Sequence, residues 1–203
     1  QAVFRAAIPV LPYRTPVILN RLEEIPEVIL KNKSSRVLLI TDSGICRLGL
    51  TARLEKALKK HQIACFIYDK TVANPTTDNV AEALKLYKQN YCDAIIGFGG
   101  GSSMDCAKAV GACIARPKKP LGKMAGVLKV LKKLPLLIAV PTTAGTGSET
   151  TLAAVITDSK TRHKYPVNDF VLIPKYAVLD PKVTISLPPF VTATTGLDAL
   201  THA

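Results

Sequence analysis

The chain has 203 residues, of which 48% are hydrophobic, which is enough to bury a core and excludes a disordered chain. Its 27 lysines and arginines exceed its 15 aspartates and glutamates and give a formal net charge of +12, but they are spread along the chain without a recognition motif, so we expect solvated faces and no nucleic-acid partner. No apolar run approaches the roughly 18 residues of a membrane-spanning helix and no signal-peptide pattern opens the sequence, which predicts a cytoplasmic protein without a membrane contact.

Short aliphatic runs alternate with amphipathic segments over the first 140 residues. The runs at residues 36–41, 63–68, 94–98 and 136–140 are bounded by turn residues and are predicted to be buried strands. Residues 51–60 and 77–90 repeat apolar side chains at helical spacing. Strands that recur roughly every thirty residues with helices between them predict an α/β fold, with a Rossmann-like parallel sheet covered by helices on both faces.

Residues 116–135 stand apart from this alternation, and the character of the sequence changes after residue 140. Residues 116–135 are rich in lysine and proline, which predicts a surface excursion, and residues 154–157 with the turn 158–164 predict a hairpin. Residues 186–189, Ser-Leu-Pro-Pro, are typical of a helix start, and residues 194–203 predict the beginning of a second helix. We therefore expect one α/β domain at residues 1–185 and the start of an all-helical domain at residues 186–203, whose remainder lies outside this sequence.

Three consecutive glycines, Gly99, Gly100 and Gly101, follow the third predicted strand and precede a helix predicted over residues 104–112. Glycine lets backbone N–H groups approach a ligand closely, and a helix N-terminus favours negative charge, so this segment suits a phosphate or pyrophosphate. The alternative is a tight turn with a capping box from Ser102 to Asp105 and no ligand. The pattern differs from the G-x-G-x-x-G that follows the first strand of ordinary Rossmann dehydrogenases.

Two further polar segments follow predicted strands. Asp42 comes after the first strand, where a carboxylate can accept both ribose hydroxyls of an adenosine and would repel a 2′-phosphate. Its alternative role is to cap the segment that follows. Residues 141–151, Pro-Thr-Thr-Ala-Gly-Thr-Gly-Ser-Glu-Thr-Thr, follow the fourth strand, and their short hydroxyls and glycines suit a loop around a polar ligand.

Asp198 and His202 stand four residues apart in the last predicted helix, so both side chains project from one face about a turn apart. A carboxylate and an imidazole suit ferrous iron or zinc, but two ligands are too few for a tight site. Taken alone, such a pair is more often a surface pair.

Three motifs together resemble the iron-containing (group III) alcohol dehydrogenase family: Gly99-Gly100-Gly101-Ser102-x-x-Asp105, the segment 141–149, and Thr195-Gly196-x-Asp198 continued to Ala203. The resemblance extends over nearly the whole chain from about residue 17. It implies an NAD(P)-binding α/β domain followed by a helical domain that completes a metal site. The implied enzyme interconverts an alcohol and its aldehyde or ketone by hydride transfer to nicotinamide, with the metal as a Lewis acid at the alcohol oxygen.

The resemblance also implies roles for individual residues. Asp198 and His202 match the first two of four ligands to Fe²⁺, with Zn²⁺ as the alternative, and the other two ligands are histidines expected beyond residue 203. Asp42 favours NAD over NADP. A homo-oligomer, most simply a homodimer, is implied as well. The residues implied to line the dinucleotide are Asp42, Asn74, Gly99, Gly100, Gly101, Ser102, Asp105, Thr142, Thr143, Thr146, Thr151 and Lys164.

Other functions stay open on the sequence alone. A glycerol dehydrogenase-like or dehydroquinate synthase-like enzyme has the same fold and a similar glycine loop. A chain of this length could also be an NAD-binding fragment without turnover. A nucleic-acid-binding protein rests on charge alone and would bind weakly and in a salt-dependent way. The sequence does not identify the alcohol.

Overall fold

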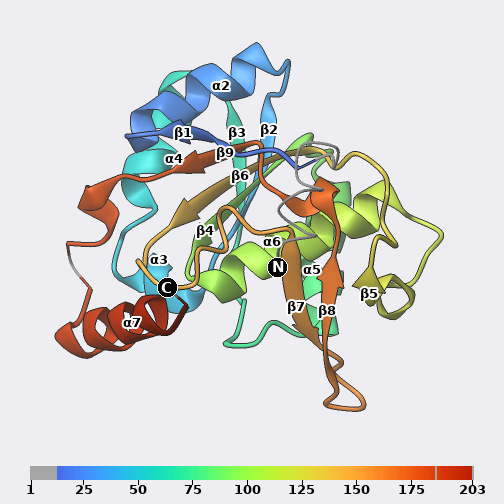
Figure 1. Ribbon diagram of the computed structural model, residues 1–203. Coiled ribbons are helices and arrows are strands. Elements are labelled where there is room, and N and C mark those ends of the chain that lie inside the picture. Colours follow the sequence, from blue (N-terminus) through green and yellow to red (C-terminus); the bar gives the residue numbers. More distant parts are fainter. Residues whose placement is uncertain (1–12, 186, 203) are drawn as a thin grey trace.

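The computed structural model of the chain describes residues 13–185 and 187–202. Its centre is a six-stranded sheet in the order β1-β9-β6-β4-β2-β3, in which all neighbouring strands are parallel (Figure 1). The strands are β1 Val17–Leu19, β2 Arg36–Ile40, β3 Ala64–Tyr68, β4 Ala94–Gly99, β6 Leu136–Pro141 and β9 Tyr176–Val178. The four predicted strands are confirmed to within one residue at each end, and β1 and β9 extend the sheet on the side of β6.

Helices cover both faces of this sheet, which confirms the predicted fold class. They are α2 Ile25–Lys31, α3 Ser43–Arg47, α4 Ala52–Lys60, α5 Thr77–Gln89 and α6 Gly101–Ala115. Val37 and Leu39 of β2 belong to the same core as Leu54 of α4. Leu38 and Ile40, which point the other way, belong to a second core with residues of α5 and α6. Because the central strands are buried on both faces, they are nearly continuous apolar runs in the sequence.

A smaller sheet, in the order β5-β8-β7, packs beside α6 (Figure 1). Its strands are β5 Gly126–Val127, β7 Ala153–Thr157 and β8 Lys164–Asn168. β7 and β8 pair antiparallel, so the predicted hairpin is confirmed. The prediction of a surface excursion at residues 116–135 is wrong in part, because β5 pairs with β8 and the side chains of Met124 and Val130 are fully buried. These apolar residues anchor a segment whose lysines mostly face solvent.

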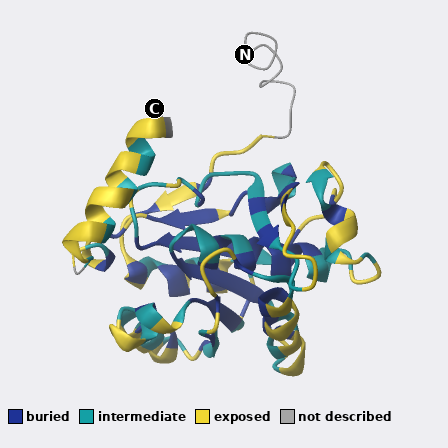
Figure 2. Cartoon of the chain, turned by 90° about the horizontal axis from the view of Figure 1, so that it is seen from below, coloured by how far each residue is buried: buried dark blue, intermediate teal, exposed yellow. Residues whose placement is uncertain are grey.

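The last helix, α7 Pro189–His202, is continuous, so the prediction of two separate helix starts is wrong. Prolines 188 and 189 stand at its start, where a helix needs no N–H donor, and the Thr192 N–H donates to the Pro188 carbonyl at 3.0 Å. Most of α7 is exposed (Figure 2), including Phe190 and Leu197. Among the described residues, no helix is long and apolar enough to cross a membrane. The domain boundary near residue 185 stays a prediction.

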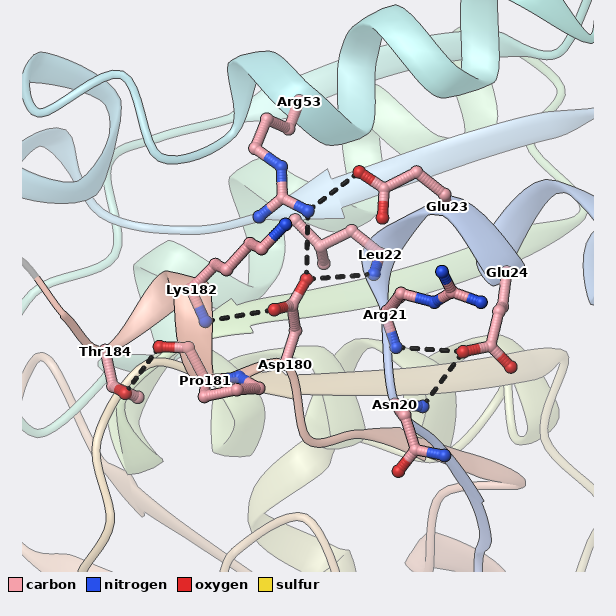
Figure 3. A network of polar contacts seen from close by, with 10 residues as sticks. All are labelled: Asn20, Arg21, Leu22, Glu23, Glu24, Arg53, Asp180, Pro181, Lys182 and Thr184. Carbon is pink, nitrogen blue, oxygen red and sulfur yellow. Dashed lines mark hydrogen bonds and ion pairs between the residues drawn. The ribbon is translucent and has the colours of Figure 1, made fainter.

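Four short 3-10 helices, Leu22–Glu24, Leu121–Met124, Phe170–Leu172 and Pro181–Val183, complete the described elements. The buried carboxylate of Asp180 joins two of them (Figure 3). It accepts hydrogen bonds from the N–H groups of Leu22 at 3.2 Å and Lys182 at 3.0 Å, and it lies 3.1 Å from the guanidinium of Arg53. Burial alone would raise the pKa of Asp180, but these partners together hold it below its usual value. The network ties the segment that leads to α7 onto α4 and the start of the chain.

The described cysteines are all free thiols, and Cys106 of α6 is completely buried. Burial raises the pKa of the Cys106 thiol from 9.0 to about 12. A thiol that stays neutral in the folded state and ionises in the unfolded chain stabilises the fold fully below pH 9, and this contribution is lost as the pH rises from there towards the folded pKa.

For Cys106→Ala we therefore expect the free energy of unfolding to fall less steeply above pH 9 than in the unaltered chain. The difference in slope should approach about 1.4 kcal/mol per pH unit, which is the free energy of one pKa unit. Urea denaturation of both proteins from about pH 8 to about pH 10.5 measures it. Equal slopes would contradict the prediction.

Candidate functional site

The candidate site lies at the carboxyl ends of the neighbouring strands β2 and β4. The chain leaves β2 through α3 and α4 on one face of the sheet and leaves β4 through α6 on the other. Adjacent parallel strands whose connections leave in opposite directions open a crevice at their carboxyl ends, which is where α/β sheets bind ligands. Asp42 follows β2 at this crevice, and Gly99, Gly100 and Gly101 follow β4.

Residues 99–101 form a close turn from β4 into α6, called the glycine turn below. Gly99 has φ +142°, and a Cβ atom there would lie 2.7 Å from the Ser103 hydroxyl, so both the backbone and the space require glycine. α6 begins at Gly101, three residues earlier than predicted, and the capping box from Ser102 to Asp105 is not formed, because the Asp105 carboxylate binds other partners. The N-cap residue is Gly100, which has no side chain to cap the first N–H groups of the helix. These groups suit an anionic ligand.

The polar loop at residues 142–151, called the threonine loop below, lies over this turn. The Thr142 N–H donates to the Gly99 carbonyl at 3.0 Å, which starts the loop beside the glycines. The hydroxyl of Thr143 lies 3.8 Å from the position of a Cβ at Gly100. The Thr146 side chain is 3.3 Å from the same position at Gly101. The structure therefore brings together the glycine segment and the threonine loop, as the sequence predicts.

Three other predicted residues, Asn74, Ser102 and Lys164, meet at the start of α6. The Asn74 N–H donates to the Ser102 hydroxyl at 3.2 Å. Lys164 of β8 donates from its ammonium group to the Asn74 side-chain oxygen at 2.6 Å. Both Asn74 and Lys164 are exposed, so a ligand at the start of α6 can reach them.

The Asp42 carboxylate fulfils the alternative role that the sequence allows, because one oxygen caps α3. It accepts from the N–H groups of Gly44 at 2.9 Å and Ile45 at 3.0 Å. The second oxygen lies 3.5 Å from the position of a Cβ at Gly99. Capping therefore leaves a negative charge beside the glycine turn, and the two roles of Asp42 are compatible.

The sequence analysis missed Lys108, which lies under the loop. Its side chain is completely buried, and its ammonium group donates to the carbonyls of Ser148, Thr151 and Ala153. Burial lowers the pKa of Lys108 to about 8, which the nearby charge of Asp105 opposes. A single charged residue after Asp105 in an otherwise small and apolar helix was the signal that could have revealed it.

Asp105 and Thr151, both predicted to line a dinucleotide, have partners within the protein. Asp105 accepts from the Ser148 hydroxyl and from the Val155 N–H, each at 3.0 Å, and burial raises the pKa of its carboxyl. The Thr151 hydroxyl lies 2.9 Å from the Lys108 ammonium group. These two side chains hold the loop in place, and their contact with a ligand stays a prediction.

Asp198 and His202 are separated by one turn of α7. The helix reaches the loop at Thr195, whose carbonyl lies 2.9 Å from the position of a Cβ at Gly145. Asp198 is half-buried and stands one turn beyond this contact. Among the side chains that the structure describes, which do not include that of His202, no three histidine, cysteine or acidic groups come together as a metal site. The pair can supply two ligands and needs others.

Comparison with known proteins points to one family. The family model described as iron-containing alcohol dehydrogenase matches residues 16–181. Alcohol dehydrogenase 4 of Saccharomyces cerevisiae is 39% identical over 181 residues, which are 89% of this chain and 47% of that protein. The NAD-dependent methanol dehydrogenase of Bacillus methanolicus is 38% identical over 170 residues, which are 84% of this chain and 44% of that protein.

The fold is similar to solved structures as well. The crystal structure of a 1,3-propanediol oxidoreductase superposes with a TM-score of 0.89 at 32% identity, over 94% of this chain and 50% of that one. The chain spans about half the length of the curated relatives that it matches.

Proposed function

The chain belongs to the iron-containing alcohol dehydrogenase family, and we propose that it forms the NAD-binding half of a metal-dependent enzyme that interconverts a small alcohol and its aldehyde or ketone. One observation supports this most directly: the uncapped start of α6, the threonine loop and the Asp42 carboxylate meet at the crevice between β2 and β4. We place the α/β domain at residues 1–185 and the beginning of a helical domain at α7.

The residues of the crevice fit a dinucleotide. The pyrophosphate would bind the N–H groups at the start of α6, where the glycine turn lets it approach the backbone. Asp42 would accept the hydroxyls of the adenosine ribose. Thr143, Thr146 and Lys164 would donate to the remaining oxygens of the cofactor, and their positions around the glycine turn support this. Holding the cofactor in one orientation is the contribution of this half of the enzyme to hydride transfer.

This chain supplies two of the ligands of the proposed metal site. Asp198 and His202 offer one carboxylate and one imidazole from the same helix, which suits Fe²⁺ and also Zn²⁺. A bound metal ion would supply a Lewis acid for the alcohol oxygen. Further ligands, the residues that choose the alcohol, assembly as a homo-oligomer and the cytoplasmic location belong to the proposal for the whole protein.

Calorimetric titration with NAD and NADP, with and without Fe²⁺ or Zn²⁺, tests the cofactor proposal. We expect this chain to bind NAD more tightly than NADP, in a manner largely independent of metal. No binding of either cofactor, to this chain or to the full-length protein, would contradict the proposal. NAD binding by a full-length protein that oxidises no alcohol would favour the second candidate, a binding module without turnover.

Asp42→Asn is expected to shift cofactor preference towards NADP. Asparagine still accepts the capping hydrogen bonds of α3 but no longer carries the charge that repels a 2′-phosphate. The ratio of the dissociation constants for NADP and NAD should fall by about tenfold or more, or about 1.4 kcal/mol. Asp78→Asn, at an exposed site in the first turn of α5, is the matched control. An unchanged ratio in Asp42→Asn would remove the role of this carboxylate.

A further inference from the structure

Lys108 is a buried cation inside the sheet-facing helix α6. Its ammonium group lies 2.7 Å from the Ser148 carbonyl, 2.9 Å from the Thr151 carbonyl and 2.8 Å from the Ala153 carbonyl. An ammonium group has three N–H donors, so these three carbonyls can satisfy it completely. The acceptors stand at the end of the threonine loop and the beginning of β7.

Asp105, one turn before Lys108, accepts hydrogen bonds from other polar groups of the same segment. The Ser148 hydroxyl donates to one Asp105 oxygen, and the Val155 N–H donates to the other. Ser148 is therefore held twice, through its hydroxyl by Asp105 and through its carbonyl by Lys108. Among the other charges nearby, Glu149 acts to raise the pKa of Lys108 and Lys164 acts to lower the pKa of Asp105.

The hydrogen bonds within the loop span only two or three residues, such as that from the Thr150 N–H to the Gly147 carbonyl at 2.9 Å, so they do not fix its position against α6. Residues 142–151 form neither helix nor strand, and two of them are glycines. Burial of an ammonium group is costly, and an apolar residue of similar size would pack at position 108 at a lower desolvation cost. A methionine there would remove the one donor that joins the three carbonyls to α6, so what the lysine provides is the position of the loop.

We propose that Lys108 is a positioning residue that pins the end of the threonine loop to α6 and so keeps Thr143 and Thr146 over the glycine turn. The proposal rests on the proposed dinucleotide site, which this loop covers. Lys108 does not reach that site, because its ammonium group is fully used by the underside of the loop.

Amide hydrogen exchange tests the positioning role without any cofactor. In Lys108→Met we expect peptides from residues 142–152 to exchange at least about tenfold faster, while peptides from β4 keep their rates. NAD affinity should fall by about tenfold or more in the same variant. Lys108→Arg keeps the charge but replaces the compact ammonium group with a larger, planar guanidinium, so both effects should be intermediate.

Leu58→Ala is the control for a general loss of stability. Leu58 is fully buried in α4 on the opposite face of the sheet, and its truncation destabilises the fold without touching the loop. Unchanged loop exchange in Lys108→Met, or equal loop exchange in Leu58→Ala, would overturn the proposal. If Lys108→Met does not fold, unchanged loop exchange in Lys108→Arg overturns it instead. If Lys108→Met shows faster loop exchange but neither the unaltered chain nor the full-length protein binds NAD, the dinucleotide function is refuted and the positioning role stands.

Discussion

Gly99→Ala is expected to weaken NAD binding strongly and to destabilise the fold. At φ +142° a side chain is strained, and the added Cβ would lie 2.7 Å from the Ser103 hydroxyl and 3.0 Å from its Cβ. Ser103 belongs to the first turn of α6 and is itself buried, so it has little freedom to move. The start of the helix must shift, and with it the N–H groups proposed to bind the pyrophosphate.

We expect the free energy of unfolding to fall by about 2–4 kcal/mol, from the backbone strain and the contact together. The dissociation constant for NAD should rise by about a hundredfold, or about 2.7 kcal/mol. Urea denaturation and calorimetry measure the two effects. Gly122→Ala is the matched control, because its Cβ would meet nothing within 4 Å. Wild-type NAD affinity in a folded Gly99→Ala protein would show that the glycine turn does not bind the cofactor.

The parallel sheet could be predicted because its central strands are long and buried on both faces. β2, β4 and β6 have five or six residues each and are nearly continuous apolar runs. β1 and β9 have only three residues each, which is too short for a pattern to stand out, and two of the three residues of β1 are exposed. The two strands beyond β6 were therefore missed, although the other four strands were predicted correctly.

Two predictions were wrong because residue composition was taken as evidence of local structure. The glycines and serines before residue 104 have low helix propensity, so the start of α6 was predicted too late. Tertiary contacts decide otherwise, because the sheet and the threonine loop enclose this turn. At residues 116–135 the lysines concealed the irregularly spaced Met124 and Val130, which are buried against the main body.

The candidate site could be predicted where the type of a residue indicates which ligand group it can bind. Glycines, threonines and Asp42 lie at strand ends in the sequence, and the topology of a parallel sheet brings those ends together. Lys108 could not be placed in the same way. Its role depends on three carbonyls about forty residues further along the chain, and backbone acceptors leave no trace in residue identity.

The largest effect on turnover is expected from Asp198→Ala in the full-length protein. A carboxylate at this position can bind a metal ion directly, and its loss leaves His202 without its partner on the same helix. A Lewis acid at the alcohol oxygen contributes several kcal/mol to catalysis, so turnover should fall by about a thousandfold or more. NAD affinity should stay unchanged, because the proposed cofactor contacts lie at the glycine turn.

Turnover, metal content and NAD affinity must be measured together, because only their combination separates a metal ligand from a structural residue. If Asp198 and His202 are metal ligands, Asp198→Ala and His202→Ala should lose metal and activity in parallel while both keep NAD binding. Thr194→Ala, at an exposed position of the same helix, should change none of the three. If Asp198→Ala keeps its metal but loses NAD affinity, α7 acts instead through its contact with Gly145, and the Asp198 carboxylate is not a ligand. Unchanged metal content and turnover in both variants would remove the metal site from α7.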